Sequence, residues 1–217
     1  MSARGPAESA TDDAPGARAR GPRGGGTDTR ADIVAAAAHA FAERGYAAAS
    51  MRAIAREAGV DPALIRHYFG GKADLFAEAL RPLRADDARV AALLAVPRER
   101  LGEEFVRLVV SLWEDPVLAP RLRAIMGSMT AVEEVGPAFA GMMMRDVMLR
   151  MVREDQAAVR AAACATQVAG LAMGRYVVRL PALVEATTDQ VVRLYGPVLQ
   201  HFIDGDLDDG LDTAPPA

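Results

Sequence analysis

The segment Ser50–Phe76 constrains the fold of this chain most, because it predicts two short helices joined by a tight turn. Ser50 is a suitable N-cap, and the residues after it place three apolar side chains at the spacing of an inward-facing stripe: Ile54, Ala55 and Ala58. Gly59 ends this helix because glycine adopts positive φ at little cost. Asp61 and Pro62 then begin a second helix as N-cap and first helical residue.

The second helix has about seven residues before Phe69 and Gly70, and its two faces differ. Ile65 and Phe69 lie one turn apart and are expected to face inward. Four other side chains then project outward, and most of them suit contact with DNA bases or phosphates: Ala63, Leu64, Arg66 and His67. This layout is that of a DNA-reading helix-turn-helix.

Lys72 is the single lysine among 25 basic residues, and it begins the next predicted helix after Gly70 and Gly71. A cation opposes the positive end of the helix dipole, whereas the unpaired N–H groups there attract anions. A bound phosphate would satisfy both, so Lys72 is a predicted phosphate contact. The alternative is a solvated surface lysine.

These residues resemble the TetR family of transcriptional regulators over about sixty positions. The pattern consists of Ala53-Ile54-Ala55, Ala58-Gly59-Val60, His67-Tyr68-Phe69 and Lys72-Ala73-Asp74-Leu75. The resemblance implies that the helix near Pro62 enters the major groove of DNA, that Tyr68 and Lys72 bind DNA phosphates, and that Ser50 contacts the DNA backbone. The chain departs from the family at Ile65-Arg66, where leucine-tyrosine is usual, and Arg66 suits either a phosphate or a guanine edge.

The predicted DNA-contacting set combines the helix faces with this resemblance. It comprises Thr29, Ser50, Met51, Arg52, Pro62, Ala63, Leu64, Arg66, His67, Tyr68 and Lys72. The formal net charge of −4 argues against nonspecific coating of nucleic acid but leaves selective binding open.

The predicted fold is all-α, with an N-terminal three-helix helix-turn-helix domain and a C-terminal helical ligand-binding and dimerisation domain. The 217 residues suffice for two cores, and 51% hydrophobic residues with few aromatics and no alternating β-branched runs favour helices. The predicted boundaries are a disordered tail at 1–27, the DNA-binding domain at 28–88, the second domain at 89–204 and an acidic tail at 205–217. Arginines at 18, 20, 23 and 30 form either a DNA-binding arm or part of an inert tail.

The remaining helices are predicted from caps, glycines and prolines. Thr29 and Asp32 resemble a capping box for a helix that ends at Gly45, and a long helix runs from Lys72 to about residue 94 with a kink at Pro82. Thr187 and Gln190 form a capping box for the last helix, which Gly196-Pro197 should bend. The expected ranges are 98–113, 117–127, 137–153, 155–179 and 188–203.

The helix at 155–179 is rich in small residues, so another backbone can approach it closely. Together with the last helix it resembles the helix pair through which TetR proteins form a four-helix bundle across a two-fold axis. Packing within one subunit is the alternative. The predicted dimer interface is Ala158, Ala162, Ala165, Ala169, Val191, Leu194, Tyr195, Val198 and Phe202.

Eight of the ten methionines lie between Met126 and Met173. Methionine lines adaptable apolar cavities, although it also fills cores. The sequence therefore predicts a ligand pocket lined by some of Phe105, Trp113, Met126, Met129, Met144, Met148, Gln167, Leu171 and Tyr176.

These features favour a homodimeric, ligand-responsive transcriptional regulator that binds a palindromic DNA operator and is released by a small apolar effector. Repression is favoured over activation. A helical carrier of apolar metabolites is the alternative. An enzyme with Cys164 as nucleophile is disfavoured because no HExxH, CxxC or phosphate-loop motif occurs, and no cofactor or metal is expected. The single cysteine and the absence of a secretory signal or an apolar span of about 20 residues predict a cytoplasmic protein without membrane contact.

Overall fold

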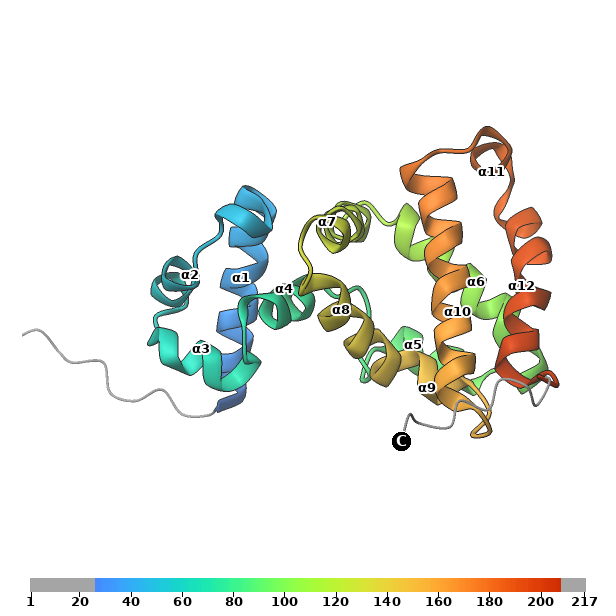
Figure 1. The fold of residues 1–217 in the computed structure, drawn as a ribbon, viewed down its shortest axis with the longest axis horizontal. Helices are drawn as coiled ribbons and strands as arrows, with labels where there is room; N and C mark the ends of the chain where they lie inside the picture. The colour runs from blue at the N-terminus through green and yellow to red at the C-terminus, as the bar shows by residue number, and fades with distance from the viewer. Residues whose placement is uncertain (1–25, 208–217) are drawn as a thin grey trace, which may run out of the picture.

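The computed structural model describes residues 26–207, which form helices and no strand. The first lobe lies at one end of the elongated molecule (Figure 1). It consists of α1 (Gly26–Ala48), α2 (Met51–Ala58), α3 (Pro62–Phe69) and α4 (Lys72–Leu80). The predicted all-α fold is confirmed within this range.

Two predicted helix limits in the first lobe are wrong. Helix α1 begins at Gly26, so Thr29 lies inside the helix and is not its N-cap. The long helix predicted from Lys72 is broken, because α4 stops at Leu80 and Arg81 is extended with φ −59° and ψ 134°. Pro82 disfavours helical backbone at the residue before it, so it ends the helix where a kink was expected.

Gly45 interrupts α1 with φ 71° and ψ 174°, so the predicted stop is confirmed as a break in direction. One more helical turn follows before Ser50 caps α2.

The second lobe contains eight α-helices, one 3₁₀ helix and two π-helical turns among the described residues. In order, these are α5 (Ala88–Ala95), η1 (Arg98–Arg100), α6 (Leu101–Glu114), α7 (Leu118–Ala131), α8 (Val135–Met143), η2 (Met144–Met148), α9 (Leu149–Met151), α10 (Ala157–Ala172), η3 (Met173–Val177), α11 (Pro181–Glu185) and α12 (Thr188–Asp204). The capping box of Thr187 and Gln190 is confirmed at the start of α12, whereas α11 was not predicted.

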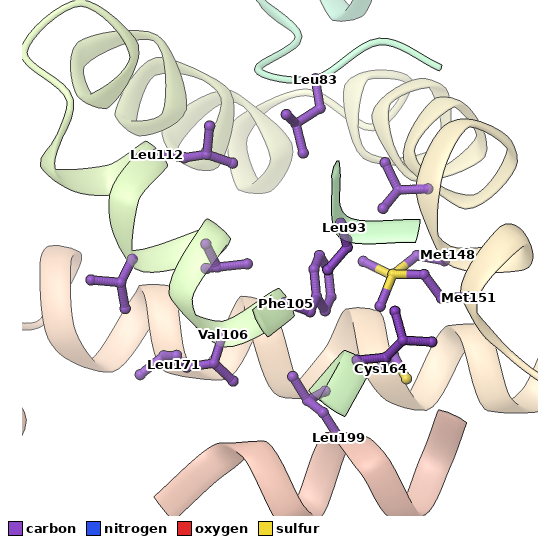
Figure 2. Close-up of a cluster of buried hydrophobic side chains, with 14 of the residues drawn as sticks. Leu83, Leu93, Phe105, Val106, Leu112, Met148, Met151, Cys164, Leu171 and Leu199 are labelled. Carbon is purple, nitrogen blue, oxygen red and sulfur yellow. The ribbon is translucent and has the colours of Figure 1, made fainter. Parts of the chain in front are cut away.

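Each lobe has its own buried cluster, and α7 and α8 join the two. Ile125 and Val135, from these two helices, are buried in the cluster of the first lobe. The cluster of the second lobe includes side chains from α6, α10 and α12 around Phe105 (Figure 2). Leu83 also belongs to it and comes from residues 81–87, the segment between α4 and α5 that we call the joint. The change of core therefore falls between Leu80 and Leu83.

Among the described residues, no helix combines the length and hydropathy that crossing a membrane requires. Most of the two predicted disordered tails, and the arginines at 18, 20 and 23, lie outside the described residues.

Candidate DNA interface and ligand cavity

The turn between α2 and α3 has the geometry that its sequence predicts. Ser50 Oγ accepts a hydrogen bond from the Ala53 N–H at 3.2 Å and caps α2. Gly59 adopts φ 69°, and the Val60 N–H donates to the Ala55 carbonyl at 2.9 Å, as in a Schellman turn. The chain therefore reverses sharply after α2.

Helix α3 begins and ends at defined caps. Asp61 Oδ1 accepts from the Ala63 N–H at 2.7 Å, and Pro62 occupies the first turn. At the other end Gly70 has φ 77°, and its N–H donates to the Arg66 carbonyl at 2.8 Å. These caps confine α3 to eight residues.

The two faces of α3 are those predicted. Ile65 and Phe69 are 0% and 8% exposed, so they anchor the helix to the first lobe. The opposite face carries exposed Pro62, Ala63, Arg66 and His67, with Leu64 and Tyr68 half-buried at its margins. In the described part of the chain, Arg52 and Arg66 make no hydrogen bond or ion pair, which leaves both guanidinium groups available to a ligand.

Lys72 already has partners inside the lobe. Its Nζ donates to the Ala47 carbonyl at 3.2 Å and lies 4.6 Å from the centre of the Tyr46 ring. Partial burial lowers the pKa of this ammonium. Because an ammonium has three donors, two remain for an anion at the start of α4. Tyr46 was missed by sequence reasoning, since no local pattern pairs it with a lysine in another helix.

Helix α1 contacts both helices of the helix-turn-helix, α2 and α3. His39 Nδ1 lies 2.8 Å from Glu57 Oε1 on α2, and this hydrogen bond, with the nearby carboxylate of Glu43, raises the pKa of His39. The Arg30 guanidinium lies 5.0 Å from the centre of the Phe69 ring on α3. Of the other predicted contacts, Thr29 and Met51 are half-buried, and Arg52 is exposed.

The second lobe contains a cavity of about 460 Å³ between α6, α7, α8, η2 and α10. Six of the nine predicted ligand-pocket residues line it: Phe105, Trp113, Met126, Met129, Met144 and Met148. No charged side chain from the described residues lines this cavity, and of its lining residues only Thr166 and Trp113 have a side chain with an oxygen or nitrogen atom. Such a wall suits an apolar molecule.

The other three predicted pocket residues do not line the cavity. Leu171 is 2% exposed in the core, and Gln167 lies near it around α10, away from the cavity wall. Tyr176 stacks behind Trp113, with ring centres 5.1 Å apart. The sequence missed wall residues on several elements: Leu83, Val109, Leu122, Phe139, Met143 and Thr166.

The small residues of α10 face this cavity as well as solvent. Ala162, Ala165 and Ala169 line the cavity, and Ala162 and Ala169 are also exposed. The cavity therefore opens along this edge of α10. These three alanines had been predicted as dimer contacts.

The rest of the predicted dimer interface divides by exposure. Leu194 and Val198 are 61% and 40% exposed on one face of α12, where a core residue would be buried. Tyr195 and Phe202 are half-buried beside them, and Ala158 is exposed on α10. Val191 is a correction, because it is 1% exposed and covered by its own chain.

Cys164 is buried in α10, and burial raises the pKa of its thiol to about 11. Thiolate is therefore scarce at neutral pH, which argues against a nucleophilic role.

Two family models match this chain. The model of bacterial regulatory proteins of the tetR family matches residues 33–79, which cover most of the first lobe. The model of the tetracyclin repressor-like C-terminal domain matches residues 99–203.

Individual relatives agree with these models. The HTH-type transcriptional regulator BetI of Rhizobium meliloti (strain 1021) is 43% identical over 77 residues, which are 34% of this chain and 38% of the relative. The chain thus matches well under half the length of this curated relative.

Solved structures extend the similarity to both lobes. A TetR-family regulator from Streptomyces coelicolor A3 is 36% identical, with a TM-score of 0.61 over 85% of this chain and 99% of that one. The multidrug binding protein EbrR, solved with proflavin, shares the fold at 18% identity and a TM-score of 0.50, over 81% of this chain and 99% of that one.

Proposed function

Because this chain belongs to the TetR family of transcriptional regulators, we propose that it acts as a homodimeric repressor that a small apolar molecule releases from a palindromic operator. Its DNA-binding character follows from the family. What we propose beyond this is the palindromic operator, the homodimer and the release by a small apolar effector.

The observation that carries the DNA part is the exposed face of α3. This face presents Ala63, Arg66 and His67 on a helix whose two ends are fixed by Asp61 and Gly70. Arg66 has no partner in the described residues, and its planar fork matches the O6 and N7 acceptors of guanine. We infer that Arg66 reads a guanine, whereas Ser50 and Lys72 position the protein on phosphates.

The apolar cavity supports the effector. Its volume of about 460 Å³ lies in the range of small-molecule sites, and its methionines suit ligands of varied shape. The fold neighbour EbrR, a multidrug binding protein, was solved in complex with proflavin. A ligand in this cavity would favour a spacing of the two reading helices that no longer fits the operator.

The exposed apolar face of α12 supports the dimer. Leu194 and Val198 on this face would become buried against the same face of a second copy, as in an isologous interface. Two α3 helices held about 34 Å apart would then reach successive major grooves on one side of the DNA.

A helical carrier that never touches DNA is the second candidate, and the cavity is the observation that favours it. A carrier function, however, gives no role to the exposed face of α3 or to the caps of that helix. The expected cytoplasmic location stays a prediction from the sequence.

The proposal is tested by selecting bound fragments from a random DNA pool, with and without small-molecule cell extract, and measuring affinities by fluorescence anisotropy. We expect Arg66→Ala to lose about 1 to 3 kcal/mol on the selected operator and much less on random DNA. Lys72→Ala should weaken both alike and reduce the salt slope by about one. Arg123→Ala, which removes an exposed arginine of the second lobe, is the matched control.

Equal losses on operator and random DNA for both variants would contradict these roles. Failure to select any fragment would favour the carrier.

A further inference from the structure

An ion pair connects the wall of the cavity to the first lobe. Arg81, directly after α4, donates from Nη1 to Asp146 Oδ2 on η2 at 2.5 Å and from Nη2 to Glu78 Oε1 on α4 at 2.7 Å. Both Arg81 and Glu78 have side chains 10% exposed, and that of Asp146 is 17% exposed. At this burial a charge-assisted pair is stronger than an exposed surface pair.

The connection continues into the first lobe through Glu78. The same Oε1 atom accepts from Arg30 Nη2 on α1 at 2.8 Å and from Arg84 Nη1 at 3.1 Å. Arg30 also lies over the Phe69 ring of α3. A continuous set of contacts therefore runs from η2 through α4 to α1 and α3.

Both ends of the Arg81–Asp146 pair adjoin the cavity. Asp146 lies between Met144 and Met148, and both methionines line the cavity. On the other side Pro82 and Leu83 follow Arg81 directly and line it too. Figure 2 shows Leu83 and Met148 among the side chains that converge around Phe105. A molecule that enlarges the cavity thus acts on both ends of the pair.

Two local features make this joint easy to rearrange. Asp146 belongs to a π-helical turn, a rare form that is common at functional sites. Arg81 Nε is buried without a hydrogen-bond partner, so the present arrangement leaves one donor unsatisfied. A second arrangement therefore need not sacrifice a fully satisfied network.

We propose that the Arg81–Asp146 pair is the link through which occupation of the cavity changes operator affinity. This inference rests on the proposed function. A ligand that displaces Met144 and Met148 moves Asp146 and, with it, the paired Arg81, and this movement reaches the reading helices through Glu78 and Arg30. The two residues are positioning residues, because neither lines the cavity nor lies on the exposed face of α3.

The test uses N-phenyl-1-naphthylamine, an uncharged aromatic probe, and the full-length chain. Probe binding is followed by its fluorescence, and operator affinity is measured with and without saturating probe. Wild-type affinity should fall about 5- to 150-fold with the probe bound. Asp146→Asn should bind probe and operator within about twofold of wild type while its response to the probe falls to about threefold or less.

Three further variants complete the design. Asp146→Glu keeps the charge and should restore the response. Asp86→Asn removes an exposed carboxylate of the same joint, paired with Arg84 at 3.3 Å, and should respond as wild type does. If circular dichroism shows that Asp146→Asn is unfolded, Glu78→Gln breaks the next contact and should lose the response instead.

A full response in folded Asp146→Asn and Glu78→Gln would overturn this inference while leaving ligand-released repression intact. Absence of any response in wild-type protein that has bound the probe would overturn both the link and the release by apolar ligands, but not the DNA binding.

Discussion

Two glycines of this chain are required for different physical reasons. Gly59 has φ 69°, and a Cβ built there would have open space around it. Gly102 lies where α6 crosses α12, and a Cβ there would lie 2.4 Å from the Gly196 carbonyl oxygen and 2.7 Å from the Gln200 nitrogen. The first glycine satisfies a backbone conformation, and the second allows two backbones to approach.

Substitution by alanine separates these two requirements. Gly59→Ala should lower the free energy of unfolding by about 1 kcal/mol, because only the left-handed conformation penalises the new side chain. Gly102→Ala should lower it by about 2 kcal/mol or more, since α6 and α12 must move apart. Urea unfolding measures both values. Equal, small effects would mean that the two helices do not cross so closely.

The caps of α2 and α3, whose partners are near in sequence, were predictable. Ser50, Gly59, Asp61 and Pro62 act within one turn of the chain, and their predicted roles as caps or helix starts are confirmed. The partners of Lys72 were not predictable, because Tyr46 and Ala47 reach it only through tertiary packing.

At the level of the helix, amphipathic patterns were more informative than alanine-rich ones. Ile65 and Phe69 fixed which side of α3 is buried. Helix α10 is almost uniformly small and apolar, so its sequence could not show which side faces the cavity. Gln167 and Leu171 were consequently predicted to line the cavity, although neither does, and Ala165, predicted only as a dimer contact, does line it.

The break after α4 illustrates a different difficulty. Pro82 was recognised, but a proline can either kink or end a helix. The outcome depends on whether the next residues have better partners elsewhere, and here Leu83 is buried in the core of the second lobe. Sequence alone does not reveal this competition.

The elements around the cavity predict a preference for uncharged ligands. No described charged side chain lines the wall, so a buried ion would lose hydration without gaining a counter-charge. We expect 4-nitroanisole to bind at least about tenfold more tightly than 4-nitrobenzoate or 4-nitrobenzylammonium. Quenching of Trp113, the single tryptophan, reports binding. Tight binding of either ion would place the ligand elsewhere.

At the scale of the whole molecule, the exposed face of α12 bears on assembly. Leu194→Glu together with Val198→Glu should convert the proposed dimer to monomer, because two charges would be buried at its centre. Sedimentation equilibrium measures the mass. Val117→Glu is the control, since Val117 is 61% exposed but lies between α6 and α7. A monomeric wild type, or a double variant that remains dimeric, would contradict this interface.

The two lobes are built for separate tasks and share one joint. The first lobe presents a short, firmly capped helix, and the second encloses an apolar cavity whose wall includes Pro82 and Leu83 of that joint. The lobe order was visible in the sequence, but the ion-paired contact between Arg81 and Asp146 was not, because its residues lie 65 positions apart.

The central claim is that the exposed face of α3 lies in the major groove of the operator. An iron chelate attached to the cysteine of Ala63→Cys cleaves the DNA near it. Labelling should be selective for this cysteine, because Cys164 is buried and the pKa of its thiol is raised to about 11. We predict cleavage at two symmetric positions of the operator, about one helical turn apart. Cleavage no stronger than that from an identical chelate at Arg123→Cys would contradict the account.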